Sequence, residues 1–134
     1  RQMMYMSCDV NKFINPKTGV ESLQNYDYGS LFNTTFPMNK ADRIRTFASA
    51  SSHAMTLMAV DIAANGKFNK WMVENSWGAT SGYQGHLIMT DEWFDEYMFR
   101  LVVEKRFVPA ATLKLFEQKP TLLPAWDPLF AGEE

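Results

Sequence analysis

The sequence predicts an α+β fold, and two observations carry this prediction. Two apolar runs, 53–63 and 68–73, flank an Asn-Gly dipeptide that begins at Asn65. This arrangement is the strongest short signal for a β-hairpin. Thr90 then precedes two acidic residues, the pattern of an N-cap followed by acids in the first helical turn. Strands joined by a tight turn and followed by a separate helix are typical of the α+β class.

The N-terminal half contributes one more strand and several connections. Residues 1–10 are rich in Met, Tyr and Val and predict a strand that ends at Asp9. Pro16 and Gly19 favour a turn over 15–19, because Pro presets φ and Gly permits positive φ. The segments that follow are less regular: a short helix or turn over 23–32, a loop over 33–39 and a helix-compatible stretch over 40–49.

The C-terminal half alternates short elements before a proline-rich end. We expect a strand over 86–89, a helix after Thr90 that turns Trp93, Phe94 and Tyr97 inward, a strand over 101–108, and a helix from Pro109 to about Gln118. Three prolines exclude a helix from the last segment, which we expect to be extended. The chain therefore divides into a folded part, 1–118, and a tail, 119–134.

Composition and charge exclude two classes of partner. The 134 residues suit one globular domain, with 46% hydrophobic and 21% charged residues. A net charge of −2 offers no basic surface for nucleic acid. The longest run without charges or proline, 46–60, is too short and too polar to span a membrane.

The cysteine count and the first residues bear on the origin of the chain. Cys8 is the single cysteine, so an intrachain disulfide is excluded. The chain begins with Arg1 rather than Met and enters an apolar stretch at once. We therefore expect it to be a segment of a longer protein.

His53 and Asn75 are the residues most suited to chemistry. His53 opens the first apolar run, and Asn75 follows the second, so a hairpin would bring the two side by side. An asparagine oxygen can accept a hydrogen bond from one imidazole nitrogen and leave the other nitrogen free to meet a thiol. The indole of Trp77 could shield that hydrogen bond from water and so strengthen it.

Taken singly, these residues have simpler explanations. A histidine at the start of an apolar strand is usually structural, and an asparagine before Ser-Trp-Gly usually belongs to a turn. His53 and His86 show no metal-ligand spacing with the scattered acids, so we expect no metal site. We expect His86 to be a half-exposed strand residue.

The joint context of the pair resembles papain-like cysteine peptidases. Asn75-Ser76-Trp77-Gly78 before a Gly and an aliphatic strand resembles their asparagine region, and Ser52-His53-Ala54 resembles their histidine region. Within these peptidases the chain is similar to the bleomycin hydrolase and bacterial aminopeptidase C family, and the resemblance runs in one order along nearly the whole chain. The matching segments are Cys8-Asp9-Val10, 53–56, 70–78 with Glu74, 90–94 and 123–128.

The resemblance implies the C-terminal portion of a papain-like peptidase fold, the β-rich part with the histidine and asparagine. The parent would be a cysteine aminopeptidase acting on peptides, with His53 as acid and base, Asn75 orienting it and Trp77 shielding the pair. It implies no cofactor, a cytoplasmic location and a hexamer. The nucleophilic cysteine would lie in an N-terminal part that these 134 residues lack.

Cys8 is a poor candidate for the nucleophile. A reactive thiol needs a cation or a helix N-terminus to lower its pKa, whereas Cys8 lies in an apolar strand before the carboxylate of Asp9. The resemblance also matches it to a non-catalytic cysteine. The chain alone should therefore be inactive. The alternative to a cysteine aminopeptidase is a non-catalytic fragment or pseudo-peptidase that binds without cleaving.

The tail carries the last functional expectation. In the family that the chain resembles, the C-terminus lies in the active-site cleft and meets the substrate's α-amino group. Glu133 and Glu134 are then the candidates for gating the cleft against longer substrates. The sequence departs from the family pattern at Phe130, where Gly is usual, and at Gly132, where an aliphatic residue is usual.

Overall fold

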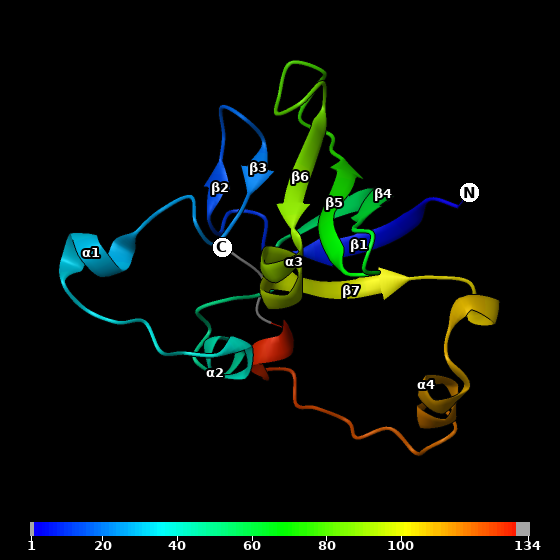
Figure 1. Cartoon of the computed structure of the whole chain (residues 1–134). Coiled ribbons are helices and arrows are strands. Elements are labelled where there is room, and N and C mark those ends of the chain that lie inside the picture. Colours follow the sequence, from blue (N-terminus) through cyan, green and yellow to red (C-terminus); the bar gives the residue numbers. More distant parts are fainter. Residues whose placement is uncertain (1, 131–134) are drawn as a thin grey trace.

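The computed structural model describes residues 2–130 and contains one seven-stranded sheet (Figure 1). The strand order across the sheet is β2-β3-β6-β5-β4-β1-β7. In chain order the strands are β1 (Met4–Cys8), β2 (Ile14–Asn15), β3 (Val20–Glu21), β4 (His53–Ile62), β5 (Phe68–Glu74), β6 (His86–Thr90) and β7 (Met98–Val102). Neighbouring strands are antiparallel except β3 and β6, which run parallel.

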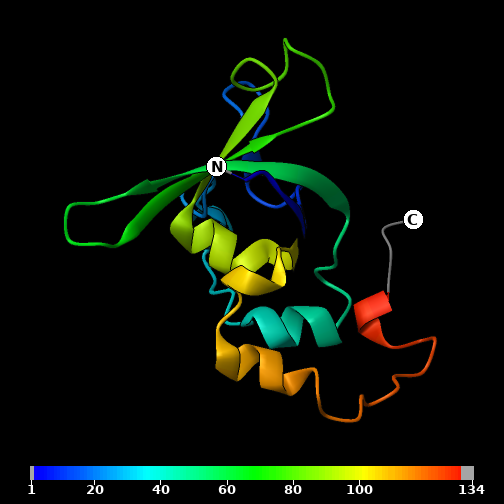
Figure 2. The same ribbon diagram turned by 90° about the vertical axis from the view of Figure 1, so that its right-hand side faces the viewer.

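Within residues 2–130, six short helical elements accompany the sheet. They are α1 (Tyr28–Phe32), α2 (Lys40–Arg45), α3 (Asp91–Tyr97), the 3₁₀ turn η1 (Lys105–Phe107), α4 (Ala110–Leu115) and the 3₁₀ turn η2 (Pro128–Phe130). Figures 1 and 2 place α2 and α4 below the strands, and α3 lies next to β7 at the lower edge of the sheet. Figure 1 shows α1 apart from the sheet on a long connection. After α4 the chain returns to α2, which η2 contacts. No helix between residues 2 and 130 is long and apolar enough to cross a membrane.

The predicted hairpin and its strands are confirmed. β4 and β5 pair in antiparallel register with Thr56 opposite Glu74. Ala63 N donates to Lys67 O at 2.8 Å across the turn, and Gly66 adopts φ +82° there. Glycine reaches this left-handed conformation without the clash that a Cβ would introduce. The hairpin thus sets the positions of the residues at its open end.

The core lies between the central strands and α3. Alternate residues of the strands point toward it, and α3 adds Trp93, Phe94 and Tyr97, as its pattern predicts. Thr90 is the N-cap of this helix, since its hydroxyl accepts from Trp93 N at 3.3 Å. The other buried hydrophobic residues are Met6, Cys8, Val10, Met55, Leu57, Val73, Leu87 and Met89.

Several boundaries differ from the sequence-based expectations. β7 begins directly after α3 and ends at Val102, so the strand expected over 101–108 is largely wrong. Val102 pairs with Tyr5, close to the first residue of β1, and little partner strand remains beyond it. The following residues turn as η1 instead.

The helix expected from Pro109 is shorter than its pattern suggests, because Pro109 serves as N-cap and α4 ends at Leu115. The tail is free of α-helix up to Phe130, but it contains η2. Strands β2 and β3 were not expected, although the turn between them was: Gly19 N donates to Asn15 O at 2.9 Å.

Candidate active site

His53 and Asn75 meet at the open end of the β4–β5 hairpin. His53 is the first residue of β4, and Asn75 directly follows β5. The Nε2 atom of His53 lies 2.8 Å from Oδ1 of Asn75, which is a good hydrogen-bond distance. The pair predicted from the sequence is therefore in contact.

The hydrogen bonds around Asn75 define the tautomer of the histidine. Ser76 N donates to Asn75 Oδ1 at 2.8 Å, so this oxygen is an acceptor. Because an acceptor faces Nε2, this nitrogen carries the proton in the neutral ring and Nδ1 keeps its lone pair. The arrangement leaves Nδ1 of His53 free to accept a proton.

The backbone of Asn75 is also held. Its N–H donates to Gly85 O at 2.9 Å, which closes the loop between β5 and β6 at its base. The side-chain nitrogen Nδ2 is buried and has no hydrogen-bond partner among residues 2–130. Asn75 thus has a fixed acceptor oxygen and one buried donor that the described residues leave unsatisfied.

Trp77 lies against His53. Its ring stacks on the imidazole of His53, with centroids 5.3 Å apart and planes inclined by 29°. Trp77 remains 46% exposed, so it is still partly open to solvent. The structure therefore brings His53, Asn75 and Trp77 together as one group.

Two glycines pack the loop after Trp77 against the β2–β3 hairpin. A Cβ on Gly19 would lie 2.5 Å from Gly82 Cα, and a Cβ on Gly82 would lie 2.4 Å from His86 O. Both residues also have positive φ, at +70° and +58°. Since no L side chain fits such distances, glycine at both positions lets the loop rest closely on the hairpin.

Cys8 lies beside His53 in the sheet but belongs to the core. It is the Cα partner of His53 in the β1–β4 ladder and is fully buried. Burial raises the pKa of its thiol far above the usual range, and the nearby carboxyls of Glu21 and Asp9 add to the shift. The thiol is therefore protonated at neutral pH and is a weak nucleophile.

The other sequence-predicted residues lie apart from this group. Glu133 and Glu134 fall outside the described residues. His86 is a half-buried residue of β6, as expected, and its Nδ1 lies 3.0 Å from Gln84 O. Within residues 2–130, no group of three His, Cys, Asp or Glu side chains could hold a metal ion.

Sequence reasoning missed a buried polar contact between the residue after β1 and the segment before β4. Ser49 Oγ donates to Asp9 Oδ2 at 2.6 Å, and both residues are buried. The sequence distance of 40 residues between them concealed the contact. An acid directly after an apolar strand and a serine-rich segment before His53 were the available signals.

The match to a family model covers residues 1–130 and carries the description Peptidase C1-like family. The chain belongs to this family and has its papain-like α+β fold, as the sequence predicted. It is 45% identical to bleomycin hydrolase of Mus musculus over 99% of the chain and 38% identical to aminopeptidase C of Lactococcus lactis over 97%. The crystal structure of PepW from Lactobacillus rhamnosis HN001 superposes on 97% of the chain with a TM-score of 0.87 and 37% identity.

These matches also locate the chain within its relatives. It spans 30% of the length of the mouse bleomycin hydrolase, of the Lactococcus aminopeptidase C and of PepW. The resemblance predicted from the motifs is therefore confirmed, and the chain corresponds to about a third of these relatives.

Proposed function

We propose that this chain is the histidine- and asparagine-bearing part of a cysteine-type aminopeptidase that removes N-terminal residues from peptides. The observation that carries the proposal is the His53–Asn75 hydrogen bond of 2.8 Å under the stacked indole of Trp77. The relatives named bleomycin hydrolase and aminopeptidase C support the same activity. The complete protein would supply the nucleophilic cysteine from a part beyond these residues.

His53 would move the proton in both steps of the reaction. Its Nδ1 would take the proton of the incoming thiol, and the thiolate would attack the peptide carbonyl. The imidazolium would then give the proton to the leaving amine, and the acyl group would remain on the sulfur as a thioester. In the second step Nδ1 would take a proton from a water molecule whose oxygen attacks the thioester, and the imidazolium would return that proton to the departing sulfur, which releases the acid product and restores the thiol. Asn75 would hold the ring through Nε2 throughout, and Trp77 would keep water from that hydrogen bond. No step of this mechanism requires a cofactor.

The tail gives the proposed aminopeptidase its preference for free N-termini. We assign 1–118 to the peptidase domain and 119–134 to a tail directed toward the cleft, with Glu133 and Glu134 facing the substrate's ammonium group. Attraction between these carboxylates and the ammonium group would favour cleavage next to a free N-terminus over internal cleavage. The resemblance to the family supports this assignment, as it supports a cytoplasmic hexamer.

The test uses the complete polypeptide that carries this chain, assayed on an aminoacyl fluorogenic substrate. His53→Ala should reduce kcat by about 10²- to 10⁴-fold, the usual contribution of a general acid–base. His86→Ala is the matched control, since His86 lies outside the group, and it should leave kcat nearly unchanged. Cys8→Ser should keep its activity, because the buried thiol takes no part.

Two outcomes would overturn the proposal. Turnover that survives His53→Ala would exclude the histidine as base, and turnover abolished by Cys8→Ser would make the buried thiol the nucleophile. A complete protein that binds peptides without cleaving them would favour the alternative, a non-catalytic fragment or pseudo-peptidase. The buried, protonated thiol of Cys8 is the observation that favours this alternative for the chain alone.

A further inference from the structure

The segment that delivers His53 to the site has no regular structure of its own. Residues 46–52 connect α2 to β4 without forming a helix or strand. Backbone of this kind is held by side chains or by neighbouring elements, or it moves. The position of His53 therefore depends on what anchors this segment, here called the entry segment.

Contacts between three pairs of residues fasten the entry segment to β1 and the residue after it. Ser49 Oγ donates to Asp9 Oδ2 at 2.6 Å, and Ser52 N donates to Cys8 O at 3.1 Å. The hydroxyls of Ser51 and Ser7 are 2.8 Å apart. The serines before His53 are thus all used to attach the segment to the neighbouring strand.

The Ser49–Asp9 hydrogen bond is the most buried of these contacts. Asp9 has no exposed surface, and Ser49 is only 3% exposed. The Oγ–Oδ2 distance of 2.6 Å is at the short end of hydrogen-bond distances, and burial removes the competing water. Losing the hydroxyl would leave a buried carboxylate oxygen without this donor.

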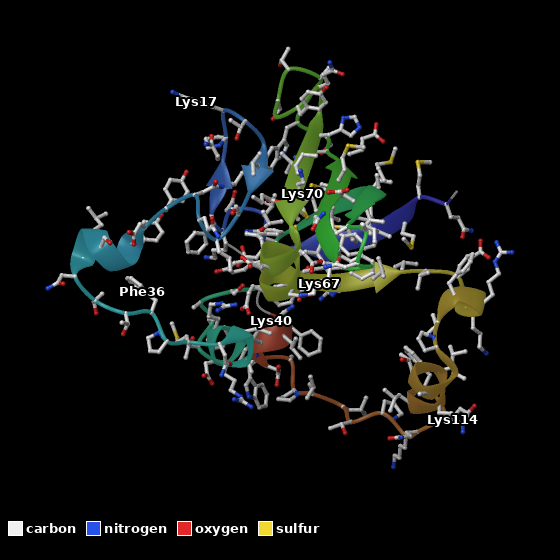
Figure 3. All side chains as sticks on the ribbon, in the orientation of Figure 1. Lys17, Phe36, Lys40, Lys67, Lys70 and Lys114 are labelled. Carbon is white, nitrogen blue, oxygen red and sulfur yellow. The ribbon has the colours of Figure 1, made fainter. Side chains whose placement is uncertain are left out.

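Asp9 and Ser49 are themselves held from a second side. Asp9 N donates to Tyr97 O at 3.0 Å, at the end of α3. Ser49 N donates to Arg43 O at 3.2 Å, at the end of α2. Lys40 of α2 (Figure 3) donates to Asp95 O at 2.7 Å and so fastens α2 to the same end of α3. The hydrogen bond therefore joins two supported points of the fold.

We propose that Asp9 is a positioning residue for His53 and acts through Ser49. The pair would hold the entry segment so that the imidazole reaches Asn75 at hydrogen-bond distance. A displacement of about 1 Å at such a site can cost about 10²-fold in rate. The catalytic role of His53 rests on the proposed function, but the positioning itself concerns only residues of this chain.

The first test measures the imidazole directly in the 134-residue chain. The Nε2–H proton of His53 is followed by NMR in a ¹⁵N-labelled sample, together with its exchange with solvent. Ser49→Ala, which removes one hydroxyl and little volume, should speed this exchange by about tenfold. Asp9→Asn should act in the same direction, and the double variant should exchange no faster than the stronger single one, because both act through one contact.

Thr90→Ala is the matched control. This substitution also removes one side-chain hydroxyl, the N-cap of α3, which accepts a hydrogen bond from the backbone of the buried Trp93. Thr90 lies outside the entry segment. The substitution should leave the exchange of the His53 proton unchanged while lowering thermal stability. Equal exchange in wild type and Ser49→Ala, or equal acceleration by Thr90→Ala, would overturn the proposal.

The second test measures kinetics in the complete polypeptide. Ser49→Ala should lower kcat by about tenfold and change KM by less than about twofold, since orientation rather than binding is lost. An unchanged kcat together with unchanged proton exchange would refute the positioning role. Absence of activity in the wild type would instead refute the proposed function, and the NMR result would still decide the role of Asp9.

Discussion

The sheet with α3 and the segment from residue 103 to 130 differ in how they are stabilised. The sheet region buries eleven hydrophobic side chains in one cluster, and Trp93, Val73 and Met89 have no exposed surface. In the later segment none of the described residues is buried. Phe116, Leu122 and Trp126 there are 82%, 89% and 80% exposed.

The difference separates the region that builds the His53–Asn75 site from a segment whose described residues have no buried side chain. His53 and Asn75 stand on strands with a core of their own, so their geometry depends little on the segment after 102. The later segment exposes large apolar side chains, which is typical of a surface that packs on another part of a protein. The region around His53 and Asn75 and the segment from 103 to 130 should therefore respond differently to the same substitutions.

Trp93→Ala should have the largest effect, because it removes the largest fully buried side chain. The indole Nε1 donates to Lys12 O at 2.7 Å, and the ring contacts that of Tyr97. Loss of a buried tryptophan costs about 3–5 kcal/mol of unfolding free energy, enough to unfold a small domain. Urea unfolding followed by circular dichroism measures the loss, and a change below about 1 kcal/mol would contradict the described core.

Glu21→Gln should have an intermediate effect that depends on pH. Glu21 is fully buried, and neither of its carboxyl oxygens has a hydrogen-bond partner among residues 2–130. Burial, with the nearby Asp9, raises its pKa from 4.5 to about 9. The folded state then holds a proton that the unfolded state releases, so this contribution is complete below pH 4.5 and is lost as pH rises toward 9.

The wild type should lose on the order of 1 kcal/mol of unfolding free energy per pH unit in this window through Glu21 alone. Glu21→Gln should flatten the slope and raise stability at pH 8. Urea unfolding at three pH values between 5 and 8 provides the measurement. Glu117→Gln, an exposed glutamate of the later segment, is the control, and an equal change in both variants would show that burial is not the cause.

Trp126→Ala should have the smallest effect, although it is the same substitution as in the core. The exposed indole loses little contact, so the unfolding free energy of the chain should change by less than about 0.5 kcal/mol. Leu122→Ala should change the unfolding free energy equally little, because Leu122 is also exposed. A loss of more than about 2 kcal/mol from either change would show that the segment packs on the sheet and would remove the contrast between the two regions.

The sequence predicted the parts of the molecule that local patterns control. The Asn-Gly turn aligned β4 with β5, and the cap at Thr90 placed α3. The contact between His53 and Asn75 could also be predicted, because the sequence motifs name the two residues and the hairpin places them side by side. The family resemblance then gave the pair its expected role.

The remaining features depend on contacts between distant residues. β2 and β3 are only two residues long, and β3 is a strand because it pairs with β6. β7 ends where β1 no longer offers a partner. The hydrogen bond of Ser49 to Asp9 joins residues 40 positions apart, and no local pattern contains it.

The buried thiol of Cys8 has a consequence for labelling. Maleimides and iodoacetamide react with thiolates that they can reach, and Cys8 is neither ionised at neutral pH nor accessible. Cys8 should therefore stay unlabelled by such reagents as long as the sheet stays folded. Any rapidly alkylated cysteine in the complete protein lies elsewhere, and late labelling of Cys8 would report that β1 has left the sheet.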